Sequence, residues 1–104
     1  MSNYQTSGTF TADGNGTSVS LRGWATLTAH FDSGSGTVTW QFKGPDGVWR
    51  SIYGGSTGTT EQAFTVSHMI NVFFGGDVAV RAVLSASSSP QIDYQIISNP
   101  NNRP

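Results

Sequence analysis

The chain contains no cysteine, and this absence excludes several classes of protein at once. Without thiols there is no disulfide scaffold, no thiolate zinc site and no cysteine nucleophile. At 104 residues the chain is nevertheless long enough to bury one hydrophobic core without such support. We therefore expect a single domain that is stabilised by packing alone.

Charged residues are also scarce. They make up 11% of the chain, and the formal net charge is -1, whereas about a quarter of the residues in a typical soluble domain are charged. Nucleic acids and anionic membranes are bound through basic surfaces, so this composition argues against both as partners. The polar surface must come instead from 14 serines and 12 threonines. Copies of such a surface repel one another weakly, which suits a protein that is packed in an assembly.

Long apolar runs are missing as well. No run approaches the ~20 residues that a membrane-spanning helix needs. The first residues, Met1 to Gln5, contain neither the basic nor the apolar segment of a secretion signal. We therefore expect a protein that is neither membrane-bound nor secreted.

Short β-type runs separated by turn residues fill the chain, while strong helix formers are rare. The clearest run is 37–43, in which apolar residues, Trp40 among them, alternate with polar ones. The sequence Gly-Pro-Asp-Gly at 44–47 is typical of a tight turn, and 48–53 follows as the returning strand. These residues predict a β-hairpin.

Further strands are expected along the rest of the chain, at 8–12, 17–22, 24–31, 61–67, 78–84 and 91–97. Seven or eight strands at this spacing predict an all-β fold. An immunoglobulin-like antiparallel β-sandwich comes first, with Trp40 as its buried core tryptophan, and a jelly roll or a small barrel is the alternative. The domain is expected to span 8–98, between an N-terminal arm at 1–7 and a flexible tail at 99–104.

Motifs that would indicate an enzyme or a metal site are absent. No serine lies in a Gly-x-Ser-x-Gly elbow on a strand-to-helix turn, because the glycine-rich run at 54–58 precedes a strand, and the six carboxylates are spread along the whole chain. His30 and His68 lack neighbouring ligands and an orienting partner, and 13–16 only imitates the start of a calcium loop. We expect no catalytic residue, no cofactor and no metal.

The twelve aromatic residues need the closest attention. Most are explained as core, but Trp24, Trp49 and Tyr53 are less settled. Trp49 and Tyr53 share one face of their strand and form an exposed pair if Val48 and Ile52 face the core. If Arg50 points outward, Trp49 packs inward instead.

The segment 68–74 is densely apolar and is either a core strand or an exposed loop with contact residues. The candidate residues for contact with a protein or a glycan are Trp24, Trp49, Tyr53, Met69, Phe73 and Phe74.

Four runs of the chain, at 36–41, 46–49, 80–84 and 90–96, resemble small β-sandwich virion proteins of tailed bacteriophages. Those proteins are short, cysteine-free chains rich in Ser, Thr and Gly that serve as capsid decoration (cement) or tail components, and the resemblance covers residues 8–98.

This resemblance implies a non-enzymatic structural protein, in the first place a head decoration protein that binds the capsid exterior and stabilises it. The implied partners are capsid or other virion proteins, together with further copies of the chain, for example as a trimer. Its place would be the virion, assembled in the host cytoplasm. The alternative is a glycan-binding module or an adhesin or tail domain that uses exposed aromatic residues.

Overall fold

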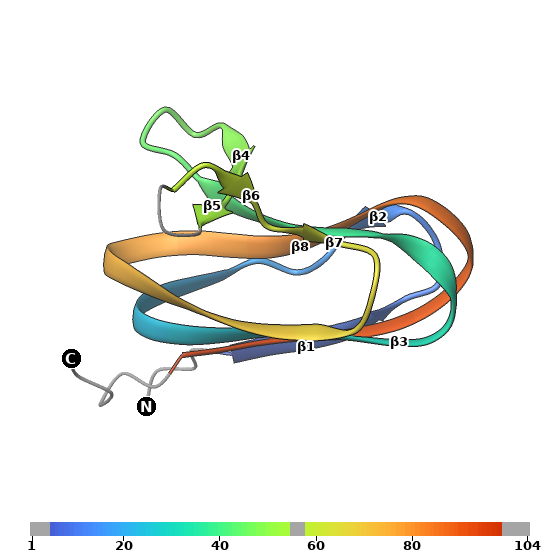
Figure 1. Ribbon diagram of the computed structural model, residues 1–104. Helices are drawn as coiled ribbons and strands as arrows, with labels where there is room; N and C mark the ends of the chain where they lie inside the picture. The colour runs from blue at the N-terminus through green and yellow to red at the C-terminus, as the bar shows by residue number, and fades with distance from the viewer. Residues whose placement is uncertain (1–4, 55–57, 99–104) are drawn as a thin grey trace.

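The computed structural model describes residues 5–54 and 58–98 and is built from β-strands (Figure 1). The strands are β1 (Gln5–Phe10), β2 (Gly14–Asn15), β3 (Val19–Lys43), β4 (Trp49–Ser51), β5 (Tyr53–Gly54), β6 (Thr60–Glu61), β7 (Ala63–Phe64) and β8 (His68–Ser98). Within the described ranges there is no helix, and hence none that could cross a membrane. The all-β prediction is confirmed.

One boundary of the domain differs from the expected one. The residues from Gln5 to Ser7, expected in an N-terminal arm, are part of β1 and pair with Gln95 to Ile97. The rest of that arm, 1–4, and the expected tail, 99–104, lie outside the described residues.

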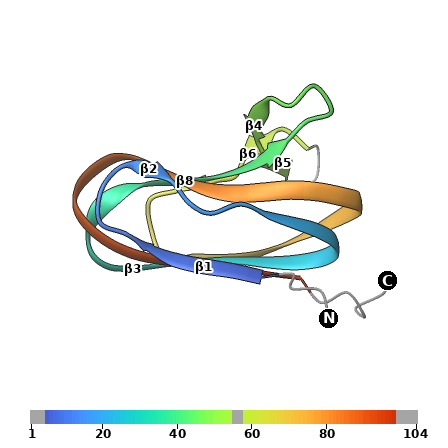
Figure 2. The same ribbon diagram turned by 180° about the vertical axis from the view of Figure 1, so that it is seen from behind.

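The strands β3 and β8 are long because each bends and runs through both layers of the molecule (Figures 1 and 2). In every run of pairs between them the residue numbers rise on one segment as they fall on the other: 23 pairs with 74, and 29 pairs with 68. The paired segments are therefore antiparallel.

The pairing divides the chain into two layers. The first layer has the order 5–10, 92–98, 23–31 and 68–74. The second has the order β2 with 19–21, then 78–85, then 37–43, and finally β4 and β7, which pair with different parts of 37–43. The first strand thus lies beside the last one, and the chain passes repeatedly between layers. This is the strand order of a jelly roll.

The immunoglobulin-like order that the sequence suggests first is therefore not confirmed. In that fold the first two strands lie side by side in one sheet. Here β1 and β2 lie in different layers, and both pair with parts of β8 (Figure 2). The alternation of residues along each strand is the same in both arrangements, so the sequence pattern does not distinguish them.

The core lies between the two layers. Trp40 is completely buried, as the sequence predicts. The inward residues of 25–29 are buried too, in agreement with their alternation. The buried apolar side chains are Phe10, Leu21, Ala25, Leu27, Ala29, Val38, Trp40, Ile52, Val80, Ala82, Leu84, Ile92, Tyr94 and Ile96.

The predicted hairpin at 37–53 is present as far as Ile52, whose amide donates a hydrogen bond of 2.8 Å to the Trp40 carbonyl. The turn at 44–47 is closed by hydrogen bonds from the Gly47 amide to the Gly44 carbonyl, at 3.0 Å, and from the Gly44 amide to the Val48 carbonyl, at 2.9 Å. Beyond it, β5 and β6 form a separate two-stranded ribbon that projects from the second layer (Figure 1).

Candidate contact surface

The first layer has an outer face that turns away from the core, and the sequence determines which residues lie on it. Successive side chains of a strand point to opposite sides. Because Ala25, Leu27 and Ala29 are buried, the residues between them point outward. The register then places outward residues of neighbouring segments side by side on this outer face: Trp24, Thr26, Thr28 and His30 from β3, Met69, Asn71, Phe73, Asp93, Gln95 and Ile97 from β8, and Gln5, Ser7 and Thr9 from β1.

An apolar patch lies on the outer face and consists of Trp24, Met69, Phe73 and Ile97, with Thr26 and Asn71 between them. The side chains of Trp24 and Phe73 are 40% and 46% exposed, and their ring centroids lie 5.4 Å apart in an edge-to-face arrangement. Met69, which is 68% exposed, lies on the same edge segment as Phe73. The patch brings together three of the six candidate residues from two separate parts of the chain.

A polar groove also lies on the outer face, with a volume of about 400 Å³. It lies across β1 and the segments 92–98 and 23–31. Its lining consists of Ser7, Gly8, Thr9, Thr28, His30, Asp93, Tyr94 and Gln95. The Thr9 hydroxyl donates a hydrogen bond of 2.7 Å to the Asp93 carboxylate. The groove therefore offers hydroxyl, amide, imidazole and carboxylate groups, and no lysine or arginine.

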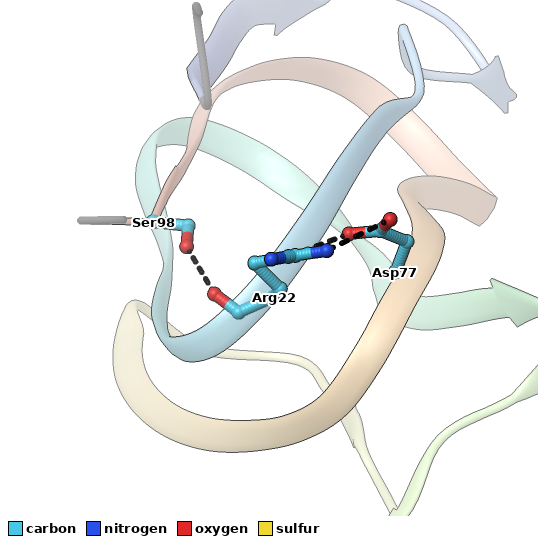
Figure 3. A network of polar contacts seen from close by, with 3 residues as sticks. All are labelled: Arg22, Asp77 and Ser98. Carbon is cyan, nitrogen blue, oxygen red and sulfur yellow. Dashed lines mark hydrogen bonds and ion pairs between the residues drawn. The ribbon is translucent and has the colours of Figure 1, made fainter. Parts of the chain in front are cut away.

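A small network of hydrogen bonds connects Arg22, Asp77 and Ser98, which come from three chain segments beside the apolar patch (Figure 3). The Arg22 guanidinium donates two hydrogen bonds to the Asp77 carboxylate, at 2.8 and 3.2 Å. The Ser98 hydroxyl donates one of 2.8 Å to the Arg22 carbonyl. The hydrogen bonds and positive charge of Arg22 hold the pKa of Asp77 below its usual value. The network joins the bend before Trp24 to the bend after Phe73, and so helps to fix the edge of the patch.

The exposed pair of Trp49 and Tyr53 that the sequence suggests is not formed. Val48 is 48% exposed rather than in the core, while Ile52 is buried, as the exposed pair requires. However, Trp49 belongs to β4 in the second layer, whereas Tyr53 belongs to the separate ribbon. The Arg81 guanidinium lies over the Trp49 ring, 4.2 Å from its centroid, and leaves that ring half-buried. Tyr53 is exposed without joining the patch.

The segment 68–74 is a strand, so the loop alternative is wrong. Its alternation separates the candidate residues within it: Met69 and Phe73 point outward, while Phe74 packs against the core. Phe74 therefore does not belong to the apolar patch.

The histidines are placed in different environments. His30 is exposed on the outer face. His68 is half-buried and structural: its Nε2 accepts a hydrogen bond from the Trp40 indole, and burial lowers the pKa of His68. Within the described residues no three His, Cys, Asp or Glu side chains gather as metal ligands.

Two parts of this surface are not among the residues singled out from the sequence. The alternation of 91–97 could have indicated that Ile97 points outward, because Ile92, Tyr94 and Ile96 point inward. The polar groove had no such signal, because its lining comes from three segments whose register is a property of the whole fold.

Comparisons with known proteins do not assign the chain to a group. No family model matches it, and no significant match was found among curated proteins or among solved structures.

Proposed function

We propose that this protein is a non-enzymatic structural protein of a bacteriophage virion, in the first place a head decoration protein that binds the capsid exterior and stabilises it. It acts in the virion, after assembly in the host cytoplasm, and its partners are capsid or other virion proteins and further copies of the chain. The single observation that carries this proposal is the apolar patch, formed by Trp24, Met69, Phe73 and Ile97.

The patch supports protein binding because of its chemistry and its place. Contiguous exposed apolar side chains on a soluble domain mark contact sites, and tryptophan is prominent among residues that dominate interface energies. Thr26 and Asn71 lie between its apolar side chains and carry no charge, and the Thr26 hydroxyl donates a hydrogen bond of 2.9 Å to Asn71. Burial of this surface against a protein requires no desolvation of an unpaired charge.

The low charge of the chain supports attachment in many copies. Neighbours on a shell repel one another weakly when only 11% of their residues are charged. Several linked contacts of modest affinity then act together, so no single contact needs to be strong. The jelly-roll strand order is also found in viral capsid domains, although a fold alone does not define a function.

Binding to expanded capsid shells of tailed phages tests the proposal. The variant Trp24→Ser should weaken co-sedimentation with the shells by about thirtyfold, the effect of losing a contact worth about 2 kcal/mol. The control Tyr53→Ser removes an exposed aromatic ring away from the patch and should bind like the wild type. A wild-type protein that never binds shells would overturn the proposal, as would equal binding by both variants.

A second candidate function is favoured by the polar groove. Its hydroxyl, amide and carboxylate groups, with no cationic side chain in the lining, suit a neutral saccharide. We expect such a ligand to depend on Asp93 and Gln95, rather than on Trp49 and Tyr53. Titration with neutral oligosaccharides should then show binding that Asp93→Ala abolishes and Trp49→Ala preserves. Loss of binding in Trp49→Ala alone would place the saccharide elsewhere.

A further inference from the structure

The first layer ends in an edge strand, the segment 68–74, that lacks the usual protection of an exposed edge. Within the described residues this segment pairs only with 23–29. Edge strands are normally protected by lysine, proline, a bulge or a covering segment, because their free amide and carbonyl groups invite a further strand. The sequence from His68 to Phe74 contains no charged residue other than a histidine, and no proline.

The side chains of this edge are complementary to themselves. If a second copy pairs antiparallel with the first, with the two Asn71 residues opposite each other, Met69 faces Phe73 of the other copy. On the inward side Ile70 faces Val72 in the same way. Four of the five apolar side chains of the edge are thus matched by apolar ones, while Phe74 faces His68. Apolar cross-strand pairs of this kind stabilise a sheet.

Space beside the edge is open at its far end. A Cβ atom built at Gly75 or at Gly76 would meet no atom within 4 Å. Asn71, at the centre, is exposed and bonds only to Thr26 of its own sheet in the described structure. Asn71 and the two glycines beyond the edge are thus accessible to a second copy.

We propose that two copies of this chain associate through antiparallel pairing of their 68–74 segments, about a two-fold axis at Asn71, so that the first layers of both copies form one continuous sheet. The two apolar patches then lie on the same face of that sheet and make one larger contact surface. This self-association is isologous and closes on itself as a dimer, rather than as the trimer that the resemblance implied. Its use as a doubled capsid-binding surface rests on the proposed function; the pairing itself does not.

Charge exchange at the two-fold axis gives the sharpest test. In Asn71→Lys two ammonium groups face each other, and in Asn71→Asp two carboxylates do, so each variant alone should raise the dissociation constant of the dimer at least about tenfold. An equimolar mixture of the two variants places opposite charges together and should restore the dimer. The control Gln95→Lys adds the same charge to the same outer face, but on a central segment of the layer, and should remain dimeric.

The measurement is light scattering after size exclusion over a wide range of concentration, combined with amide hydrogen exchange. The wild type should approach twice the monomer mass of 11.0 kDa. Those amides of 68–74 that point away from 23–29 should exchange more slowly in the wild type than in Asn71→Lys, because only backbone pairing with a second copy protects them. A wild type that stays monomeric overturns the inference, and so does a dimer that all three variants preserve.

Failure of this inference is distinct from failure of the proposed function. A paired dimer that does not bind capsid shells refutes the capsid role and leaves the pairing in place. A monomer that binds shells through Trp24 refutes the pairing and leaves the capsid role in place.

Discussion

The indole Nε1–H of Trp40 donates a hydrogen bond of 2.8 Å to Nε2 of His68, so the only completely buried tryptophan depends on a titratable side chain. The His68 Nδ1 lies 2.8 Å from the Val66 carbonyl, which assigns the ring proton to Nδ1. The His68 ring also stacks on Phe64, with ring centroids 3.8 Å apart. The neutral imidazole is therefore the form that fits both of its hydrogen bonds.

Stability should decrease when His68 is protonated. Burial lowers the pKa of His68 from its usual 6.5. Just below pH 6.5, the His68 side chain is therefore protonated in the unfolded chain but still neutral in the folded chain. The stabilisation that neutral His68 provides is complete above about pH 6.5 and is lost as the pH falls through the lower pKa of His68 in the folded state. Urea unfolding between about pH 8 and about pH 5 should show this decrease. In His68→Gln it should be absent, and in the control His30→Gln it should persist; an unchanged slope in His68→Gln would contradict the assignment.

The bend at Gly34 should not tolerate a side chain. Its φ is +77°, and an added Cβ would lie 2.1 Å from the Ser89 carbonyl oxygen. Gly34→Ala should therefore lower the free energy of unfolding by at least about 2 kcal/mol. Gly58 is the matched control, because its φ is +70° while an added Cβ meets no atom within 4 Å. Gly58→Ala should cost only about 1 kcal/mol in chemical denaturation; equal losses would mean that backbone strain, rather than the clash, dominates.

The inward residues of β3 should account for much of the stability. Leu27 is completely buried between the layers. Leu27→Ala should reduce the free energy of unfolding by about 2 to 5 kcal/mol, through lost apolar burial and the cavity that remains. Val66, which is 63% exposed, provides the comparison. Val66→Ala should change stability by less than about 0.5 kcal/mol, and a similar effect of both substitutions would be inconsistent with this core.

Arg81 should shield Trp49 from the solvent. Besides covering the ring, its Nε–H donates a hydrogen bond of 3.0 Å to the Gln41 side chain. Arg81→Ala should cost about 0.5 to 1 kcal/mol of stability and increase the quenching of tryptophan fluorescence by acrylamide. Arg81→Lys keeps the cation but not the planar group, and should give an intermediate result. Quenching that stays at the wild-type level in Arg81→Ala would show that another group covers Trp49.

Local features of this fold could be predicted because they depend on neighbours in sequence. The alternation around Leu27 and around Trp40 placed the right side chains in the core. The turn at 44–47 followed from glycine, proline and aspartate chemistry. Gly23 lies between the two expected strands 17–22 and 24–31, and its φ of 72° accompanies a change of register.

Pairing between distant segments could not be predicted in the same way. The proximity of Trp24 and Phe73 depends on the register between β3 and β8, which alternation within each strand leaves undetermined. The same holds for the groove between Thr28 and Asp93. The sequence does not decide whether 68–74 is a strand or a contact loop, because an apolar run with few polar interruptions fits both. Backbone pairing with 23–29 makes this segment a strand.

The pairing of β1 with 92–97 has a consequence for biosynthesis. A ribosome delivers β1 before the other described strands and its partner segment after all of them. Throughout elongation, Phe10 therefore has no strand to pair with, and both layers stay incomplete until the end of β8 has emerged. We expect the nascent chain to be protease-sensitive at every length short of this final segment, and to become resistant in one late step.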